Sequence, residues 1–200
     1  MEITQEVFKK MKKKYIDLLK STKRENIEAL IAFLEKNDFF EAPSSAHYHS
    51  AFKHGLLLHS LNVYEQLLEL CKIYDKEETL EKSTLIIVSL LHDICKTSFY
   101  KIEMRNKKIN GMWQEVPTYI INDVFPAGHG EKSVMMAQQF IKMSMQEILA
   151  INWHMGAFDI RCGDYQGKTA LSNSMERFKL VTLLNMADVA ATYLIEERED

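Results

Sequence analysis

A helix-length segment that is almost wholly apolar ends in a histidine and an aspartate. Residues 85–91 are apolar except for one serine, and His92 and Asp93 follow directly. A helix of this composition must be buried, so it carries the aspartate into the protein interior. An ionised carboxylate buried there costs several kcal/mol unless a cation or several hydrogen-bond donors satisfy it. The fold must therefore place a cation or several hydrogen-bond donors next to the Asp93 carboxylate.

A second acid faces the same requirement. Asp188 lies in the stretch 183–191, which has little polar surface. A lone histidine on an apolar helix face is more often a hydrogen-bonded core residue than a ligand, but two buried acids argue for a cation. Imidazole and carboxylate together bind iron, manganese, zinc or magnesium and activate a bound water. We predict one metal site from six residues: His59, His92, Asp93, His129, His154 and Asp188.

Apolar residues recur every three or four positions over most of the chain, which is the periodicity of helices. Between residues 5 and 40 this spacing predicts two amphipathic helices. Further helices are expected near residues 55–73, 83–92, 131–143 and 145–154, with Ser144 as N-cap of the last of these. A polar, glycine-containing loop is expected over about 162–170, followed by a final helix over about 175–196.

One segment breaks the helical pattern. Aromatic and β-branched residues flank Asn110 and Gly111, which both tolerate the positive φ of a type I′ turn. Pro117 limits the second strand to a sheet edge. The predicted fold class is therefore all-α, a mainly helical bundle with a small β-hairpin near residues 98–122.

Length and composition are those of a single soluble globular domain. The chain has 200 residues, 46% hydrophobic and 26% charged, which is enough to bury a full core. No repeat or long linker divides it. We expect one domain over residues 1–200, with N-terminal helices in 1–43 and a metal-binding core in 44–200.

The charge pattern selects no macromolecular partner. A net charge of −3 is too small to imply nucleic acid or an anionic membrane, and the lysine-rich run 9–14 is better interpreted as a solvated helix face. The chain starts without a basic and apolar leader, and no run of about 18 apolar residues occurs. We expect a cytoplasmic protein without a membrane partner, whose three cysteines, Cys71, Cys95 and Cys162, are reduced because they lack CxxC spacing.

The segments around these residues resemble the HD superfamily of metal-dependent phosphohydrolases, named for its His-Asp pair. They are GLLLHSL (55–61), LLHDICK (90–96) and NMAD (185–188), and the resemblance covers about residues 44–192. It implies that His59, His92, Asp93 and Asp188 bind one metal. The segments GHGEKS (128–133) and WHMG (153–156) are similar to the extra histidine motifs of the two-metal branch. There Asp93 would bridge the ions, with His129 and His154 holding the second.

Three further residues near these motifs have two interpretations each. Lys96 follows the His-Asp pair, and the resemblance implies that it points to the site and binds a substrate phosphate, whereas the sequence alone equally permits a cap on helix carbonyls. Lys132, near a predicted helix start, is either a phosphate ligand or a solvated lysine. Cys95 stands where the family usually has glycine; we interpret it as a small packing residue, with a reactive thiol as the alternative.

The resemblance implies hydrolysis of a phosphoester or phosphoanhydride by metal-activated water. Asp93 and Lys96 would be catalytic, Lys96 and Lys132 would bind the substrate, and the substrate would be a phosphorylated small molecule of nucleotide type. The cofactors would be two divalent ions of Fe, Mn, Co, Ni, Zn or Mg. The alternatives are a diiron oxygenase of the same superfamily and a nucleotide-sensing domain without catalysis. Neither the substrate nor the oligomeric state follows from motif spacing.

Overall fold

The chain folds into helices with one two-stranded antiparallel sheet, as the computed structural model describes it over residues 3–48 and 50–196. This confirms the predicted fold class. The α-helices are α1 (Gln5–Ser21), α2 (Ile27–Lys36), α3 (Gly55–Tyr74), α4 (Lys82–Leu91), α5 (His129–Gln138), α6 (Met145–Asn152), α7 (Tyr165–Arg177) and α8 (Lys179–Ala190). Three short 3₁₀ segments are η1 (Ile94–Lys96), η2 (Gly156–Phe158) and η3 (Ile160–Gly163), and a π-helix, η4 (Ala191–Ile195), continues α8.

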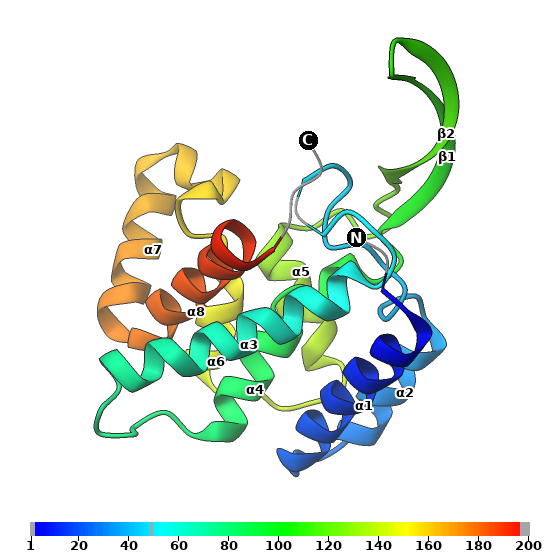
Figure 1. Ribbon diagram of the computed structural model, residues 1–200. Coiled ribbons are helices and arrows are strands. Elements are labelled where there is room, and N and C mark those ends of the chain that lie inside the picture. The colour runs from blue at the N-terminus through cyan, green and yellow to red at the C-terminus, as the bar shows by residue number, and fades with distance from the viewer. Residues whose placement is uncertain (1–2, 49, 197–200) are drawn as a thin grey trace.

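The bundle is organised around α3 and α4. Helix α3 packs on α4 and α8, and α6 packs on α4, α5 and α8 (Figure 1). Every residue of α4 from Thr84 to Leu91 is buried, as the apolar sequence predicted. Each leucine or isoleucine buried in this way stabilises the fold by about 1.5–3 kcal/mol relative to an exposed one. The end of α4, where His92 and Asp93 follow, therefore lies inside the bundle.

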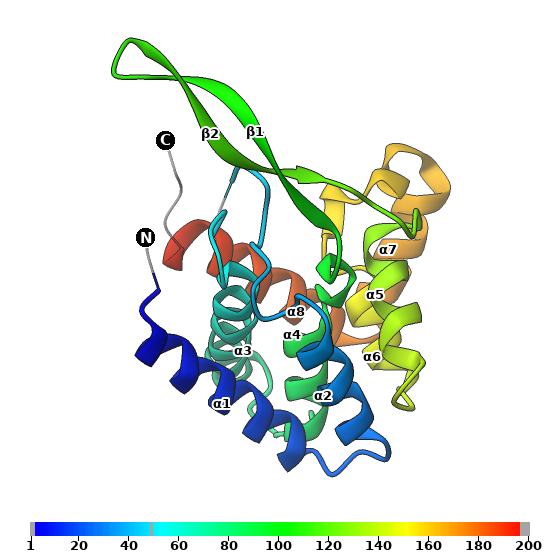
Figure 2. The same ribbon diagram turned by 90° about the vertical axis from the view of Figure 1, so that its right-hand side faces the viewer.

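The two N-terminal helices join the same hydrophobic core. Helix α1 contacts α2, α3 and α4, and Figure 2 shows α1 and α2 alongside α3 and α4. Tyr15 of α1 is fully buried against the rings of Phe39 and Phe40. Its hydroxyl donates a hydrogen bond to the carbonyl of Leu90, 2.7 Å away. The division into residues 1–43 and 44–200 within one domain stays a prediction.

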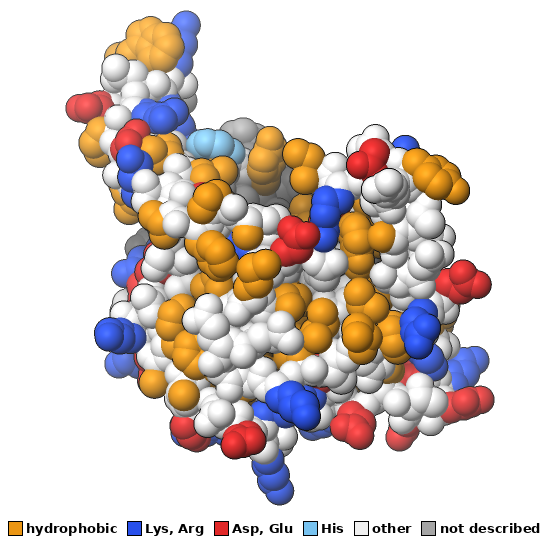
Figure 3. All heavy atoms as spheres, turned by 180° about the vertical axis from the view of Figure 1, so that it is seen from behind, with side chains coloured by type: hydrophobic (Ala, Val, Ile, Leu, Met, Phe, Trp, Pro, Cys, Tyr) orange, Lys and Arg blue, Asp and Glu red, His pale blue; other side chains and the backbone are white. Residues whose placement is uncertain are grey.

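The predicted hairpin projects from the helices as a long twisted ribbon (Figures 1 and 2). Strands β1 (Tyr100–Ile109) and β2 (Met112–Ile121) pair with Tyr100 opposite Ile121 and Ile109 opposite Met112. Asn110 and Gly111 have φ of 50° and 83°, as a type I′ turn requires. Hydrophobic and basic side chains lie side by side along the ribbon (Figure 3). Tyr100, the first residue of β1, donates its hydroxyl to the Ser44 carbonyl and fixes the base of the ribbon.

Two predicted boundaries near the C-terminus were wrong. The expected loop over 162–170 is helical from Tyr165, because the Asp164 carboxylate accepts from the Gly167 N–H and caps α7. The expected helix over 175–196 is broken at Phe178, whose backbone is extended. Within the described residues, no single helix is long and apolar enough to span a membrane. Helix α7 and the segment Lys179–Ile195 together have the required length and composition, but they are bent by 107° relative to each other.

We expect Tyr15→Phe to lower the free energy of unfolding by about 1 kcal/mol. The Leu90 carbonyl belongs to the last turn of α4, where intrahelical donors are lacking, so it would lose a buried partner. Tyr48→Phe is the matched control, because Tyr48 is 73% exposed and should change stability by less than about 0.5 kcal/mol. Urea unfolding followed by circular dichroism measures both variants. Equal losses would contradict the anchoring role of Tyr15, and two separate transitions would contradict a single domain.

Candidate metal centre

Asp93 lies at the centre of the buried polar cluster, between the end of α4 and η1. Its side chain is only 3% exposed, and its two oxygens face different partners. Oδ2 lies 3.5 Å from His92 Nε2 and 3.6 Å from His59 Nε2. Oδ1 lies 2.7 Å from His129 Nε2 and 3.6 Å from His154 Nε2. One carboxylate is thus shared by two groups of histidines.

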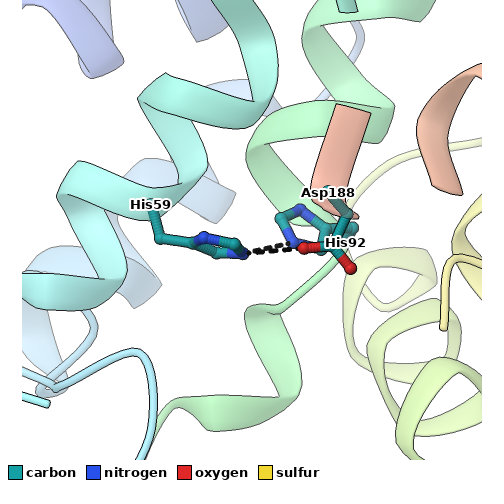
Figure 4. A group of neighbouring side chains, drawn as sticks. All are labelled: His59, His92 and Asp188. Carbon is teal, nitrogen blue, oxygen red and sulfur yellow. Dashed lines mark hydrogen bonds and ion pairs between the residues drawn. The ribbon is translucent and has the colours of Figure 1, made fainter. Parts of the chain in front are cut away.

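The first group joins three elements that are distant in sequence. His59 comes from α3, His92 follows α4, and Asp188 comes from α8. His59 Nε2 lies 3.2 Å from both His92 Nε2 and Asp188 Oδ1 (Figure 4). Ligands about 2.0–2.2 Å from a common ion are separated by roughly 3 Å, so this spacing suits one cation. With Asp93 Oδ2, the structure brings together the four residues predicted for the first metal.

The second group lies on the other side of Asp93. His129 is the first residue of α5, and His154 follows α6; their ring centroids are 5.1 Å apart. Gly130 lies so close to the Asn152 carbonyl that a side chain would collide with it, so glycine lets α5 approach α6 beside these rings. His154 Nε2 is buried and has no hydrogen-bond partner among the described residues. A cation at this second position would give the buried His154 Nε2 the partner that it lacks.

Three of the imidazoles are oriented by a partner at Nδ1, which leaves Nε2 as the proposed ligand atom. His92 Nδ1 donates to the Ser89 carbonyl and His154 Nδ1 donates to the Ile151 carbonyl, both at 2.7 Å. Because a carbonyl can only accept, these contacts leave Nε2 of each neutral ring unprotonated and directed at Asp93. His59 Nδ1 lies 2.9 Å from the carboxylate of Glu196. The donor atoms are therefore preset for metal binding.

Glu196 is a functional candidate that the sequence reasoning missed. It follows the π-helix η4 and lies behind His59, where it also accepts from Ser50 Oγ at 2.7 Å and Asn62 Nδ2 at 3.1 Å. Its eight-residue spacing from Asp188, close to two helical turns, was the only signal available in the sequence. A carboxylate behind a ligating histidine fixes the ring and raises its basicity.

Asp93 and Asp188 are both ionised at neutral pH. Burial opposes ionisation of Asp93, but Lys96 and His92 hold its pKa well below the usual range. Burial likewise opposes ionisation of Asp188, and His59 lowers the pKa of that acid. Burial lowers the pKa of His59 itself, yet Glu196 and Asp188 together raise it to about 10. Two ionised acids in a buried site supply the negative charge that a divalent cation requires.

The two predicted phosphate ligands occupy different surroundings. Lys96 Nζ donates to Asp93 Oδ2 at 2.6 Å, and its side chain is only 12% exposed, so the amine lies at the cluster. Burial lowers the pKa of Lys96, but Asp93 outweighs this effect and raises it. Lys132 is buried, and its Nζ donates to Asp123 Oδ1 at 2.5 Å, between the rings of Phe99 and Phe125. Phosphate binding by Lys132 stays a prediction.

Cys95 adopts a backbone conformation that does not require glycine. Positive φ in this turn falls on Ser98, at 54°, and the backbone N–H of Cys95 donates to Ser133 Oγ. The thiol lies 3.3 Å from His129 Nδ1, and burial raises its pKa to about 12. Cysteine at the position where the resemblance leads us to expect glycine thus fits the backbone of this turn and places a sulfur atom beside the cluster.

Comparison with known proteins adds one finding. The family model described as the HD domain matches residues 56–192, more than half of the chain. No curated protein and no solved structure matches significantly. The matched range includes all six predicted ligands and ends before Glu196.

We expect Glu196→Ala to weaken metal binding about 10- to 100-fold, because His59 loses the carboxylate that orients it. In the metal-free protein the same change should lower the pKa of His59 from about 10 towards its ordinary 6.5. Metal titration and histidine NMR measure the two effects. Glu69→Ala, an exposed glutamate of α3, is the control. Unchanged metal affinity in Glu196→Ala would remove the residue from the site.

Proposed function

The chain belongs to the HD domain family, whose domains are generally metal-dependent phosphohydrolases, and we propose that it hydrolyses a phosphoester or phosphoanhydride of a nucleotide-type substrate. The observation that carries the proposal is the division of the Asp93 carboxylate between two groups of imidazoles. A single bridging acid with donors on both sides suits a pair of divalent ions.

The proposed ligands fall into two sets around Asp93. His59, His92 and Asp188 would hold one ion with Oδ2, and His129 and His154 would hold the other with Oδ1. Divalent ions at these positions would supply a water of lowered pKa and positive charge for phosphoryl oxygens. The protein contributes fixed donor geometry: the partners on Nδ1 keep His59, His92 and His154 facing inward.

Lys96 supports a phosphorylated substrate over a neutral polyol. Its ammonium lies 2.6 Å from Asp93 and stays protonated at neutral pH, because Asp93 raises its pKa against the effect of burial. A cation next to the ligands attracts an anionic group and can donate hydrogen bonds to a phosphoryl oxygen. This favours hydrolysis of a phosphate ester over the oxygenase alternative.

The base of the hairpin supports a substrate with a planar ring. Tyr100 is close enough to Lys96 and Asp93 for their charges to affect it: burial raises the pKa of the phenol, Lys96 opposes the rise, and the net value is about 12. Its ring contacts Phe99 and Tyr119, with centroids 5.0 and 6.3 Å away. Aromatic rings beside a phosphate-binding site can stack on a nucleobase.

The most direct test is a screen of nucleotides, including cyclic ones, on anaerobically purified protein whose metal content has been measured. We expect release of phosphate or a nucleoside monophosphate without oxygen consumption, and loss of both bound metal and turnover in Asp93→Ala. Asp75→Asn is the matched control: it removes another buried acid, about 24 Å along α3 from His59, and should retain activity.

Two outcomes would replace the proposal by an alternative. Oxygen-dependent turnover of an unphosphorylated or phosphonate substrate would indicate an oxygenase. Nucleotide binding in calorimetry without turnover under Mn²⁺, Fe²⁺, Co²⁺ or Mg²⁺ would indicate a sensing domain. Full hydrolase activity in Asp93→Ala would show that the catalytic site lies elsewhere.

We expect Lys96→Ala to lower kcat/KM for the phosphorylated substrate about 10- to 100-fold, the effect of losing one charged hydrogen bond. Bound metal should remain, because Lys96 donates to the ligand Asp93 but is not one of the six proposed ligands. Lys96→Arg should restore part of the loss, and Lys72→Ala, an exposed lysine of α3, should change nothing. Lys132→Ala, assayed in parallel, tests the other predicted phosphate ligand. Wild-type kinetics in Lys96→Ala would exclude its role.

A further inference from the structure

We propose that the thiolate of Cys95 is an additional ligand at the second cation position, beside Asp93, His129 and His154. This inference deepens the proposed function and rests on its two-metal centre. It makes the second position a mixed nitrogen, oxygen and sulfur site, whereas the first position offers only nitrogen and oxygen.

The distances around Cys95 are those of ligands that share an ion. Its Sγ lies 3.8 Å from His129 Nε2, the same atom that lies 2.7 Å from Asp93 Oδ1. With metal–sulfur and metal–nitrogen bonds of about 2.3 and 2.1 Å, tetrahedral geometry separates sulfur and nitrogen by roughly 3.6 Å. One donor atom from each of Asp93, Cys95 and His129 lies within 4.8 Å of the others. The thiol now lies nearer to His129 Nδ1, at 3.3 Å, and would turn towards Nε2 to place all three donors on one cation.

An independent observation supports a cation at the second position. His154 Nε2 is buried, lies 3.6 Å from Asp93 Oδ1, and has no hydrogen-bond partner among the described residues. Its Nδ1 already donates to the Ile151 carbonyl, so Nε2 presents a free lone pair. A cation between His154, Asp93 and His129 would satisfy this acceptor and lie on the side of Asp93 where Cys95 is found.

Among the three cysteines, Cys95 alone belongs to such a group in the described structure. Cys162 is also buried, but its thiol donates to the Gly156 carbonyl and is satisfied there. Cys71 lies on α3 and is partly exposed. On binding, the cation would take the place of the thiol proton of Cys95, which leaves to solvent as the metal–sulfur bond forms.

The sulfur ligand has a consequence for metal selection. Thiolate and imidazole favour zinc, cobalt or ferrous iron over magnesium, which prefers oxygen. The second position should therefore retain one of these softer ions when magnesium is in excess. A serine or glycine at position 95 should reduce this preference, because the remaining donors are imidazole and carboxylate.

Cobalt spectroscopy on the whole protein tests the proposal without an activity assay. Metal-free protein is titrated with Co²⁺ under anaerobic conditions, and metal content is measured in parallel. We expect a near-ultraviolet thiolate-to-cobalt charge-transfer band as cobalt fills the position beside Cys95. Cys95→Ser should lose this band, keep the visible cobalt bands, and bind one of the two cobalt ions at least about tenfold more weakly. Cys162→Ser and Cys71→Ser, the matched controls, should retain the band.

The outcomes separate this proposal from the one on which it rests. Two bound cobalt ions without a charge-transfer band would overturn the role of Cys95 and leave the two-metal centre intact. Protein that binds no cobalt would overturn the centre and the thiolate ligand together. A band that survives in Cys95→Ser but disappears in either control would assign the sulfur to another cysteine. If Cys95→Ser does not fold, a band that persists in both Cys71→Ser and Cys162→Ser still assigns the sulfur to Cys95, and its absence from the unchanged protein still overturns the proposal.

Discussion

The buried carboxylate of Asp93 is the interaction on which the rest of the structure depends. It follows a helix whose residues 84–91 are all buried, so solvent cannot satisfy its charge. The fold supplies Lys96 to one oxygen and His129 to the other, with three more imidazoles within 3.6 Å. Side chains from α3, α5 and α8, and from the residue pair that follows α6, meet at the residues after α4. The packing of the bundle thus also brings together the groups that neutralise the buried charge of Asp93.

The orientation of three imidazoles, those of His59, His92 and His154, comes from contacts of their Nδ1 atoms. His92 and His154 each donate to a carbonyl three residues earlier, so the turn that ends the preceding helix also sets the ring. His59 sits within a continuous helix, where the backbone carbonyls are already engaged, and relies on Glu196 from the other end of the chain. The first two rings are therefore held by local structure, whereas His59 depends on how the C-terminal segment packs.

Periodicity and turn chemistry were sufficient for most of the fold. Helices α1 to α6 follow from apolar spacing, and the hairpin follows from Asn110 and Gly111, whose positive φ values the structure confirms. The errors lie in 162–178 and at the end of α5, which stops at Gln138 and not near 143. In 162–178 the polar residues form the exposed face of α7, and an Asp164 cap starts a helix where composition suggested a loop. The break at Phe178 has no glycine or proline signal, and the helices on either side of it, α7 and α8, pack against each other.

The sequence by itself determined which chemical groups had to meet. A carboxylate at the end of an apolar helix and another in a second apolar helix require a cation, and the histidines are the matching ligands. Only the tertiary structure decided how they are arranged: which Asp93 oxygen faces which imidazole, that Glu196 lies behind His59, and that Cys95 lies beside His129. Burial cost is a property of composition and can be read along the chain. Distances between residues 34 to 137 positions apart are set by helix packing, which no local pattern encodes.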